Sequence, residues 1–306
     1  MKLAMYAFFT HVLRHQGAEQ AVLMAKRCGF EAIEILEGVR PGSPPLFATK
    51  EAAEHLRALM EKHGIRCACY SVSINVLAKD MGQDRNVSAV DTLKRIAEIA
   101  QILGSPYLHH TLTIGYQPPE GQTVTVHDLL PDLVSHASQV AEYCDLLGLT
   151  VLYEPQGYYV NGLDGFPLFY EKMKGLGHPV GVCGDFGNSL YAGCDPTDFF
   201  ARYAAEMRHV HVKDLRLEDG ILNRQNAPSR QWDLTRDGKY ITETHLGDGI
   251  VDMDACFAKL LGVGYNGTYA LETFYRSDKD APLEQHLLRD KDFVQNKYQS
   301  IKGGRT

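Results

Sequence analysis

Four apolar segments in the second half of the chain each end on a side chain that can bind a metal ion or move a proton. The four end residues are Glu154, Asp185, His211 and Glu272. Carboxylates brought together raise one another's pKa values, and a divalent cation removes that conflict. Oxygen ligands with a single imidazole suit Mn²⁺, Mg²⁺ or Co²⁺, whereas Zn²⁺, the less favoured choice, typically takes cysteine or further histidine. Together the four predict a divalent metal site, although any one alone is more commonly a strand-end cap or a surface group.

The elements that must position these residues alternate along the whole chain. Strand-like apolar runs are expected at residues 2–9, 32–36, 66–72, 107–111, 150–154, 180–185, 209–213 and 268–272. Helical periodicity is found at 18–28, 50–63, 88–103, 128–147, near 166–173, near 196–205, at 254–261 and at 283–298. Eight strands alternating with eight helices predict an α/β fold, a single (β/α)₈ TIM barrel over residues 1–306. The alternative is a doubly wound open sheet, which for a dinucleotide would need a glycine-rich first turn that residues 9–12 lack.

A barrel would bring the four end residues to one place. Catalytic groups of such barrels lie at the C-terminal ends of the strands, and the last four strands would be neighbours. The segment 214–251 follows the seventh strand and is too long for an ordinary connection. Within it, residues 232–244 have the alternation and turn residues of a β-hairpin. We expect 214–251 to be a lid or a docking element at the barrel mouth, with a passive surface insertion as the alternative.

Composition narrows the classes of function. The net charge is −7 with no basic block, which argues against a nucleic-acid partner. No apolar run approaches the roughly 20 residues of a membrane span, and the first residues lack the pattern of a signal peptide. We therefore expect a cytoplasmic protein without a membrane partner. The seven cysteines are expected to be small buried thiols of a reducing compartment, with Cys67 and Cys69 on one face of a strand.

Five motifs carry a resemblance to a known family. They are Glu154 and residues 185–188 (Asp-Phe-Gly-Asn), 209–214 (His-Val-His-Val-Lys-Asp), 246–252 (Leu-Gly-Asp-Gly-Ile-Val-Asp) and 271–272 (Leu-Glu). With them the chain resembles the xylose isomerase-like TIM barrel superfamily, the sugar phosphate isomerase/epimerase family. The resemblance implies that Glu154, Asp185, His211 and Glu272 bind a divalent metal, most often Mn²⁺. It also makes Glu154 and Glu272 an acid/base pair on opposite faces of a keto-sugar.

The activity that this implies is that of a divalent-metal-dependent sugar isomerase or epimerase. One carboxylate would remove a proton next to the keto group, the metal would stabilise the enediolate, and the other carboxylate would return the proton. With a leaving group β to the carbanion, the same intermediate eliminates instead. Residues 232–244 also resemble the catalytic subunits of C-glycoside deglycosidases, which implies a lyase acting on a 3-keto-glycoside with a small second subunit. A homo-oligomer is the other expected assembly, and a non-catalytic or endonuclease-like barrel is the alternative from another class.

Other polar residues complete the predicted site. His109 is the third catalytic candidate because it shares a strand face with Tyr107, although it could instead be a packed, hydrogen-bonded histidine. Glu34 is expected to be paired inside the barrel or to lie at its rim, and His209 to pack one layer below His211. The candidates for substrate binding are Asn188, Lys213, Arg216 and Trp232. Asn188 stands where ketose 3-epimerases of the family usually carry a histidine, and residues 155–159 lack their Arg and Glu.

Overall fold

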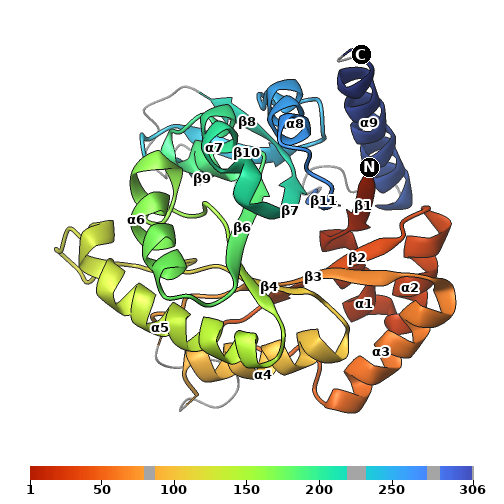
Figure 1. Ribbon diagram of the computed structural model, residues 1–306, viewed down its shortest axis with the longest axis horizontal. Coiled ribbons are helices and arrows are strands. Elements are labelled where there is room, and N and C mark those ends of the chain that lie inside the picture. The colour runs from red at the N-terminus through yellow and green to blue at the C-terminus, as the bar shows by residue number, and fades with distance from the viewer. Residues whose placement is uncertain (79–86, 219–231, 274–282, 305–306) are drawn as a thin grey trace.

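Eight parallel strands close into a barrel within the part of the chain that the computed structural model describes, residues 1–78, 87–218, 232–273 and 283–304 (Figure 1). The barrel strands are β1 (Lys2–Met5), β2 (Ala32–Gly38), β3 (Arg66–Ser73), β4 (Tyr107–His110), β5 (Thr150–Tyr153), β6 (Val180–Asp185), β7 (Met207–Val212) and β11 (Thr268–Leu271). Their order around the barrel is β1-β11-β7-β6-β5-β4-β3-β2. The predicted (β/α)₈ barrel is confirmed, and the open sheet is excluded.

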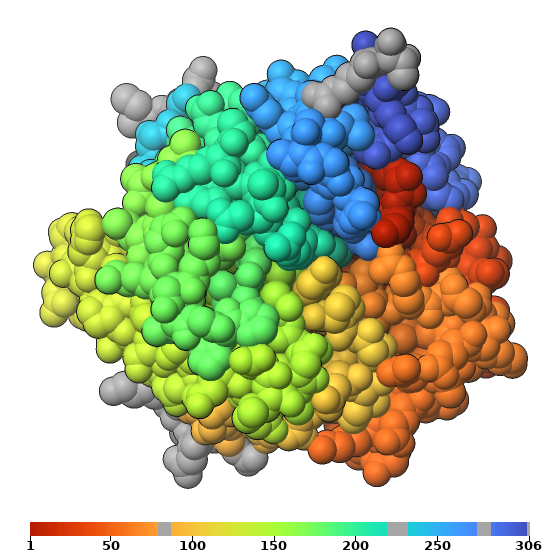
Figure 2. Space-filling model, in the orientation of Figure 1, coloured from red at the N-terminus to blue at the C-terminus, as the bar shows by residue number. Residues whose placement is uncertain are grey.

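Helices surround the barrel and cover its outer face. In the described residues they are α1 (Ala7–Gln16), α2 (Ala18–Arg27), α3 (Lys50–His63), α4 (Ala89–Ile102), α5 (Val126–Leu146), α6 (Gly162–Gly175), α7 (Pro196–Tyr203), α8 (Met253–Gly262) and α9 (Leu283–Gly303), with 3₁₀ turns η1 (Asn188–Ala192) and η2 (Ala204–Glu206). Helix α5 shows the pattern, because it buries Leu133, Ala137, Val140 and Cys144 at helical spacing. Strand β1 pairs with β11, so the two ends of the chain close the barrel, and Figure 2 shows the red N-terminal residues between orange and blue ones.

The prediction for residues 2–9 is wrong in its second half. Strand β1 ends at Met5, and Ala7–Gln16 form helix α1 instead of continuing the strand. Phe8, Phe9 and Val12 are buried on one side of that helix. A short apolar run fits a strand and a buried helical turn equally well, so periodicity could not separate them here. The other elements were placed within a few residues of their observed ends.

The segment 214–251 contains a small antiparallel sheet. Its strands β8 (Asp214–Glu218), β9 (Asp233–Leu234) and β10 (Tyr240–Thr244) pair in the order β8-β10-β9. The predicted hairpin is confirmed by the pairing of β9 with β10, whereas β8 was not foreseen. Residues 219–231 of the expected lid or docking element lie outside the described residues. The Asp214 carboxylate accepts hydrogen bonds from the backbone amides of Gly247, Gly249 and Val251, which fixes the loop that returns to α8.

Small side chains fill much of the barrel interior. Ala4, Ala32, Ala68 and Ala270 form one inner cluster with Tyr6, and Cys69 joins Leu152 and Cys183 in another. Cys67 instead packs in the large outer core, so the expectation that it shares a face with Cys69 is wrong. The reason is an irregularity in the β2–β3 register, which advances by one residue on β2 and by two on β3 between Cys67 and Cys69. All seven cysteines are free, and none of the described helices could cross a membrane.

Candidate metal centre

The four strand-end residues converge, as predicted. Glu154, Asp185, His211 and Glu272 each offer one ligand atom, and these atoms all lie within 4.8 Å of one another. Glu154 and Glu272 directly follow β5 and β11, Asp185 ends β6, and His211 is the last but one residue of β7. These four strands are neighbours in the barrel, and Asp185 is in register with His211. His211 Nδ1 lies 2.7 Å from Glu154 Oε1, 3.3 Å from Glu272 Oε2 and 3.8 Å from Asp185 Oδ2. All but the half-buried Glu272 are buried.

The carboxylate of Asp185 is held by its own strand end. Its Oδ1 accepts hydrogen bonds from the backbone amides of Gly187 (2.8 Å) and Asn188 (2.6 Å), which close a tight turn after β6. The other oxygen, Oδ2, is buried and has no hydrogen-bond partner among the described residues. The absence of a side chain at Gly187 lets the turn pack against Leu215, whose side chain would lie 2.7 Å from a Cβ there. The local sequence therefore leaves one oxygen available for a ligand.

Lys213 supplies positive charge beside the cluster. Its Nζ donates a 3.0 Å hydrogen bond to Asn188 Oδ1 and lies 3.1 Å from Glu272 Oε1 and 3.5 Å from Asp185 Oδ2. Both Lys213 and Asn188 are buried. The structure thus brings these two predicted substrate-binding residues to the metal-ligand candidates. Whether they contact a substrate stays a prediction.

The protonation states of the carboxyl groups diverge. Burial, together with the nearby Asp185 and Glu272 carboxylates, raises the pKa of Glu154 to about 8, against the opposing effect of His211. Burial would also raise the pKa of Glu272, but Lys213 and His211 lower it to about 2. The surrounding Cys183, Glu34 and Glu154 raise the pKa of His211 well above its usual value despite burial. Two carboxyl groups with opposite proton preferences at one site are an arrangement suited to acid/base chemistry.

His109 faces the cluster from β4. Its Nε2 lies 3.5 Å from Glu154 Oε2 and its Nδ1 lies 2.9 Å from the Ser71 hydroxyl. Burial and the neighbouring His211 lower the pKa of His109 well below its usual value, so the ring is neutral. His110 points elsewhere and contacts its neighbour Thr111 through Nδ1. The predicted choice of His109 over His110 therefore agrees with the geometry, and its catalytic role stays a prediction.

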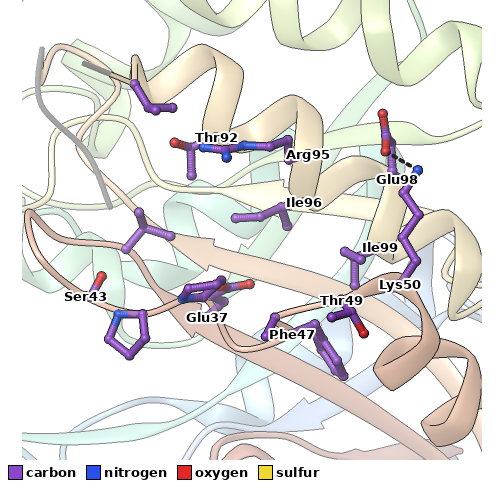
Figure 3. A pocket seen from close by; sticks show the side chains of 15 residues that line it. Glu37, Ser43, Phe47, Thr49, Lys50, Thr92, Arg95, Ile96, Glu98 and Ile99 are labelled. Atoms are coloured by element: carbon purple, nitrogen blue, oxygen red, sulfur yellow. Dashed lines mark ion pairs between the residues drawn. The ribbon is translucent and has the colours of Figure 1, made fainter. Parts of the chain in front are cut away.

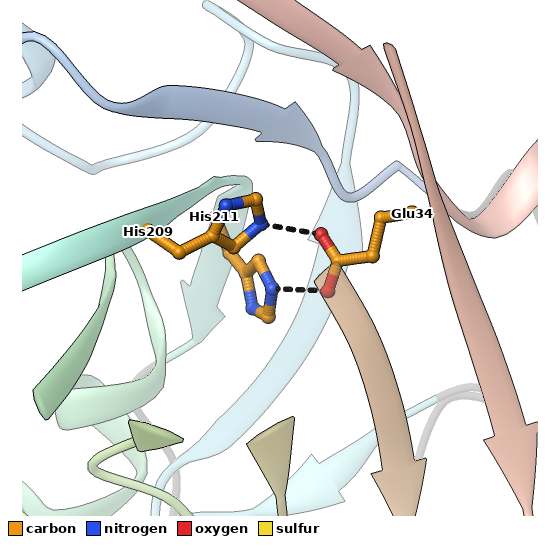
Figure 4. A group of neighbouring side chains, drawn as sticks. All are labelled: Glu34, His209 and His211. Carbon is orange, nitrogen blue, oxygen red and sulfur yellow. Dashed lines mark hydrogen bonds and ion pairs between the residues drawn. The ribbon is translucent and has the colours of Figure 1, made fainter. Parts of the chain in front are cut away.

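Glu34 is paired inside the barrel, one of the two placements expected for it. Its carboxylate lies 2.6 Å from His209 Nε2 and 3.0 Å from His211 Nε2, and the three side chains form a second candidate ligand group (Figure 4). His209 lies on the same strand as His211, is fully buried and contacts Glu34, as expected of a packed residue below the site. Tyr6, directly after β1, was expected to be a packing residue and not part of the site. It is buried, and its ring stacks on His211 with centroids 4.8 Å apart.

Two other predicted substrate-binding residues are not brought to the cluster. Arg216 is exposed on β8, and its Nε donates a 3.5 Å hydrogen bond to the backbone carbonyl of Asp248. The pairing of β8 with β10 places Arg216 opposite Thr242, in the small sheet and not on the barrel rim. Trp232 is half-buried at the start of the described part of the hairpin.

A separate cavity of about 380 Å³ lies between the loop after β2 and helix α4 (Figure 3). Its lining includes Glu37, Phe47, Arg95 and Ile96, with the Lys50–Glu98 ion pair at one side. None of the four metal-ligand candidates lines it. This cavity is therefore separate from the candidate metal centre.

Comparison with known proteins assigns this barrel to a family. The family profile described as "Xylose isomerase-like TIM barrel" matches residues 22–296. The chain belongs to the xylose isomerase-like TIM barrel family. An inosose dehydratase of Geobacillus kaustophilus (strain HTA426) is 28% identical over 227 residues, which are 71% of this chain and 70% of that protein.

Solved structures with this family's fold superpose over almost the whole chain. The structure of D-psicose 3-epimerase with D-tagatose, from Clostridium cellulolyticum H10, has a TM-score of 0.72 at 16% identity and covers 97% of this chain and 99% of that one. The IolI protein with a bound zinc atom has a TM-score of 0.69 at 14% identity and covers 98% of this chain and 99% of that one. At these identities the likeness shows the fold of the xylose isomerase-like family. The chemistry of this member must be argued from its own side chains.

Proposed function

We propose that this chain is a divalent-metal-dependent enzyme that removes a proton from a carbon next to the carbonyl of a keto-sugar or keto-cyclitol. The observation that carries the proposal is the convergence of Glu154, Asp185, His211 and Glu272 at the ends of four neighbouring strands. The family membership and the name of the inosose dehydratase relative support a polyhydroxylated carbonyl substrate.

The residues present fit a divalent cation. Three carboxyl groups share one buried site with one imidazole, and Asp185 Oδ2 is buried without a hydrogen-bond partner among the described residues. The Lys213 ammonium lies 3.5 Å away and balances its charge without a hydrogen bond. A buried oxygen without a hydrogen bond is costly in a protein interior, so a ligand is expected there. When bound, the cation would act as a Lewis acid that polarises the substrate carbonyl, and the donor set suits Mn²⁺, with Mg²⁺, Co²⁺ or Zn²⁺ as alternatives.

The chain's own residues supply the proton transfers. Glu272 is kept ionised by Lys213 and is the base that we assign to the first proton removal. Glu154 holds a proton more readily and lies beside His109 Nε2, so this pair can accept or deliver a second proton. We assign to Lys213 and Asn188, which are hydrogen-bonded to each other beside the cluster, the orientation of substrate hydroxyl groups. The base and acid roles follow from the opposite pKa shifts of Glu272 and Glu154.

Two outcomes share this first step. In dehydration, the C–H electrons form a carbon–carbon double bond, the β C–O bond breaks, and the leaving hydroxide takes a proton from the Glu154 side to depart as water. In epimerisation, the proton is returned to the same carbon from the opposite face. We place dehydration first because the Geobacillus kaustophilus relative is named an inosose dehydratase. Epimerisation is the second candidate, favoured by the presence of two carboxyl groups, Glu154 and Glu272, beside His211 Nδ1.

The test is incubation of the Mn²⁺-loaded protein with an inosose and with free ketoses in deuterated water. Dehydration gives a product that has lost one water, and epimerisation gives an isomer that carries deuterium at the reacting carbon. Mass spectrometry and proton NMR distinguish these products. A metal-loaded protein that neither exchanges the proton nor forms product with any member of the panel would contradict the proposal.

We also propose that the segment 214–251 acts as a lid or docks a second subunit. Its hairpin contacts the segments that follow β5 and β6. Arg236 donates to the Ala192 carbonyl in η1 and pairs with Asp164 in the first turn of α6, both at 2.9 Å. Tyr158, in the loop after β5, donates its hydroxyl hydrogen to the Leu234 carbonyl. These segments directly follow Glu154 and Asp185. Movement of the hairpin would therefore shift the two candidate ligands.

Replacing Arg236 is expected to weaken this contact without removing the cation. Arg236→Ala should lower kcat/KM about tenfold, roughly the value of one net hydrogen bond, while bound metal stays unchanged. The control is Arg27→Ala, which breaks an exposed ion pair with Glu284 on the other side of the barrel. Steady-state kinetics and metal analysis of both variants give the answer. Equal kinetics in the two variants, with no change in association state, would make the segment a passive insertion.

Lys213 offers a way to separate metal binding from turnover. Lys213→Met should lower kcat/KM by about 10²-fold, because it removes a preorganised charge next to the reacting groups. Metal affinity should stay equal or rise, because a positive charge that competes for Glu272 and Asp185 is lost. Metal titration and kinetics on the same preparation measure both. Loss of metal in parallel with activity would show that Lys213 only supports the ligands.

A further inference from the structure

One buried carboxylate connects three histidines inside the barrel. Glu34 on β2 is fully buried and contacts His209 and His211 directly, and Ser71 links it to His109. We propose that Glu34 is a positioning residue that fixes the ring tautomers of His211 and His109. It thereby aims an unprotonated nitrogen of each ring at the proposed metal and proton-transfer site. The metal and proton-transfer roles rest on the proposed function, whereas the tautomers are argued from the hydrogen bonds alone.

The first step concerns His211. An ionised carboxylate only accepts hydrogen bonds, so the nitrogen that faces Glu34 must carry the hydrogen. That nitrogen is Nε2, 3.0 Å from Glu34 Oε1. The other nitrogen, Nδ1, faces Glu154, Glu272 and Asp185 and lies at hydrogen-bond distance from Glu154. When a cation takes the place of the Nδ1 hydrogen, the free electron pair is on Nδ1, because Nε2 keeps its hydrogen for Glu34. Stacking on Tyr6 fixes the plane of the same ring. Glu34 therefore selects the tautomer that a metal ligand needs.

The second step passes through Ser71. Its hydroxyl hydrogen is donated to Glu34 Oε1, so the Ser71 oxygen is left to accept. His109 Nδ1 lies 2.9 Å from that oxygen and must therefore be its donor. His109 Nε2 is then unprotonated, is buried, and has no hydrogen-bond partner among the described residues. It lies 3.5 Å from Glu154 Oε2, where it can accept a proton or a hydroxyl hydrogen.

The third step concerns the cost of burying Glu34. Its two oxygens meet three donors, from His209 (2.6 Å), His211 (3.0 Å) and Ser71, and this number of donors offsets the loss of water around a buried charge. His209 thus satisfies the oxygen that His211 does not use (Figure 4). The geometry assigns His209 to the support of Glu34, one layer away from the ligand candidates.

The same strand offers a matched control. Glu37 is also buried on β2, but it lies three residues further on, so it faces the other side of the strand. Its carboxylate accepts from the Tyr70 hydroxyl (2.6 Å) and the Leu46 amide (2.8 Å), and it lines the separate cavity of Figure 3. Glu37→Gln therefore removes a buried, hydrogen-bonded charge from β2 without touching the histidines.

The experiment titrates the metal-free protein with Co²⁺ and follows the ligand-field absorption. Glu34→Gln should weaken Co²⁺ binding by about 10- to 100-fold, the usual effect of losing the hydrogen-bond partner of a metal-bound histidine. Glu34→Asp, which keeps a carboxylate, should recover part of the loss. Glu37→Gln and Ser71→Ala should bind within about twofold of the wild type, because neither touches the His211 contact. Binding by Glu34→Gln within twofold of the wild type would overturn the proposal.

The tautomers themselves are measured by long-range ¹H–¹⁵N spectra of the metal-free protein labelled with ¹⁵N-histidine. In the wild type, His109 should carry its hydrogen at Nδ1 with Nε2 bare, and His211 should carry a hydrogen at Nε2, with or without a second hydrogen at Nδ1. In Ser71→Ala, only the tautomer of His109 should change. This readout needs neither a substrate nor a metal, so it stands if the proposed function fails and also if Glu34→Gln does not fold. The opposite tautomer of His109 in the wild type would refute the inference, whatever the activity of the enzyme.

Discussion

Chelation of the bound cation is expected to abolish turnover, and Mn²⁺ or another divalent ion is expected to restore it. The physical reason is the crowding of Glu154, Asp185 and Glu272 around one imidazole, with their ligand atoms within 4.8 Å of one another. Without the cation the substrate carbonyl loses its Lewis acid, a contribution of several kcal/mol, so the rate should fall by about 10³-fold or more. The measurement is turnover after exhaustive chelation, followed by addition of Mn²⁺, Mg²⁺, Co²⁺ and Zn²⁺ in parallel.

The control for chelation is thermal stability. A cation that binds only the folded chain stabilises it by mass action, so the melting temperature should rise with Mn²⁺ concentration. This change is expected even when no substrate is present. Full turnover by a preparation that metal analysis shows to be metal-free would contradict the prediction. His211→Ala is a less specific test, because the His211 ring also stacks on Tyr6 and contacts Glu34.

The sequence was sufficient for the four candidate ligands because they depend on a single rule. Each lies at or beside the end of an apolar strand, and in a parallel barrel the ends of consecutive strands meet. Asp185 and His211 are in register on β6 and β7, and Glu272 N donates to the Val212 carbonyl, so the ends of three strands lie level. No knowledge of side-chain conformation was needed to predict that Glu154 and Glu272 are close.

The network around Glu34 could not be found in this way. Glu34, Ser71, His109 and His211 come from β2, β3, β4 and β7, and their contacts cross the barrel from one wall to another. The irregularity between β2 and β3 decides which of their residues face inward. A strand pattern predicts that a residue points inside, but the partner that it meets there depends on register and barrel closure. Helix α1 was missed for a more local reason, the ambiguity of short apolar runs.

The second large expected effect follows from the different roles proposed for Glu272, the base, and Glu154, the group that transfers the second proton. Glu272→Gln should lower the rate of proton exchange from the substrate by about 10³-fold or more, because it removes the proposed base. Glu154→Gln should lower product formation by a similar factor while exchange continues, because the first proton removal does not need Glu154. Both rates are measured in deuterated water, exchange by proton NMR and product by mass spectrometry.

Both residues are also candidate metal ligands, so the comparison needs a variant that loses a ligand without losing a proposed acid or base. Asp185→Asn is that control, because the Asp185 carboxylate is held by the Gly187 and Asn188 amides and has no assigned proton transfer. At saturating Mn²⁺, with metal content verified, Asp185→Asn should retain the wild-type ratio of exchange to product. Glu154→Gln should raise that ratio, whereas in Glu272→Gln exchange and product should fall together. If all three variants keep the same ratio, Glu154 and Glu272 act only as ligands. The base would then be sought at His109, whose neutral ring has Nε2 3.5 Å from Glu154 Oε2.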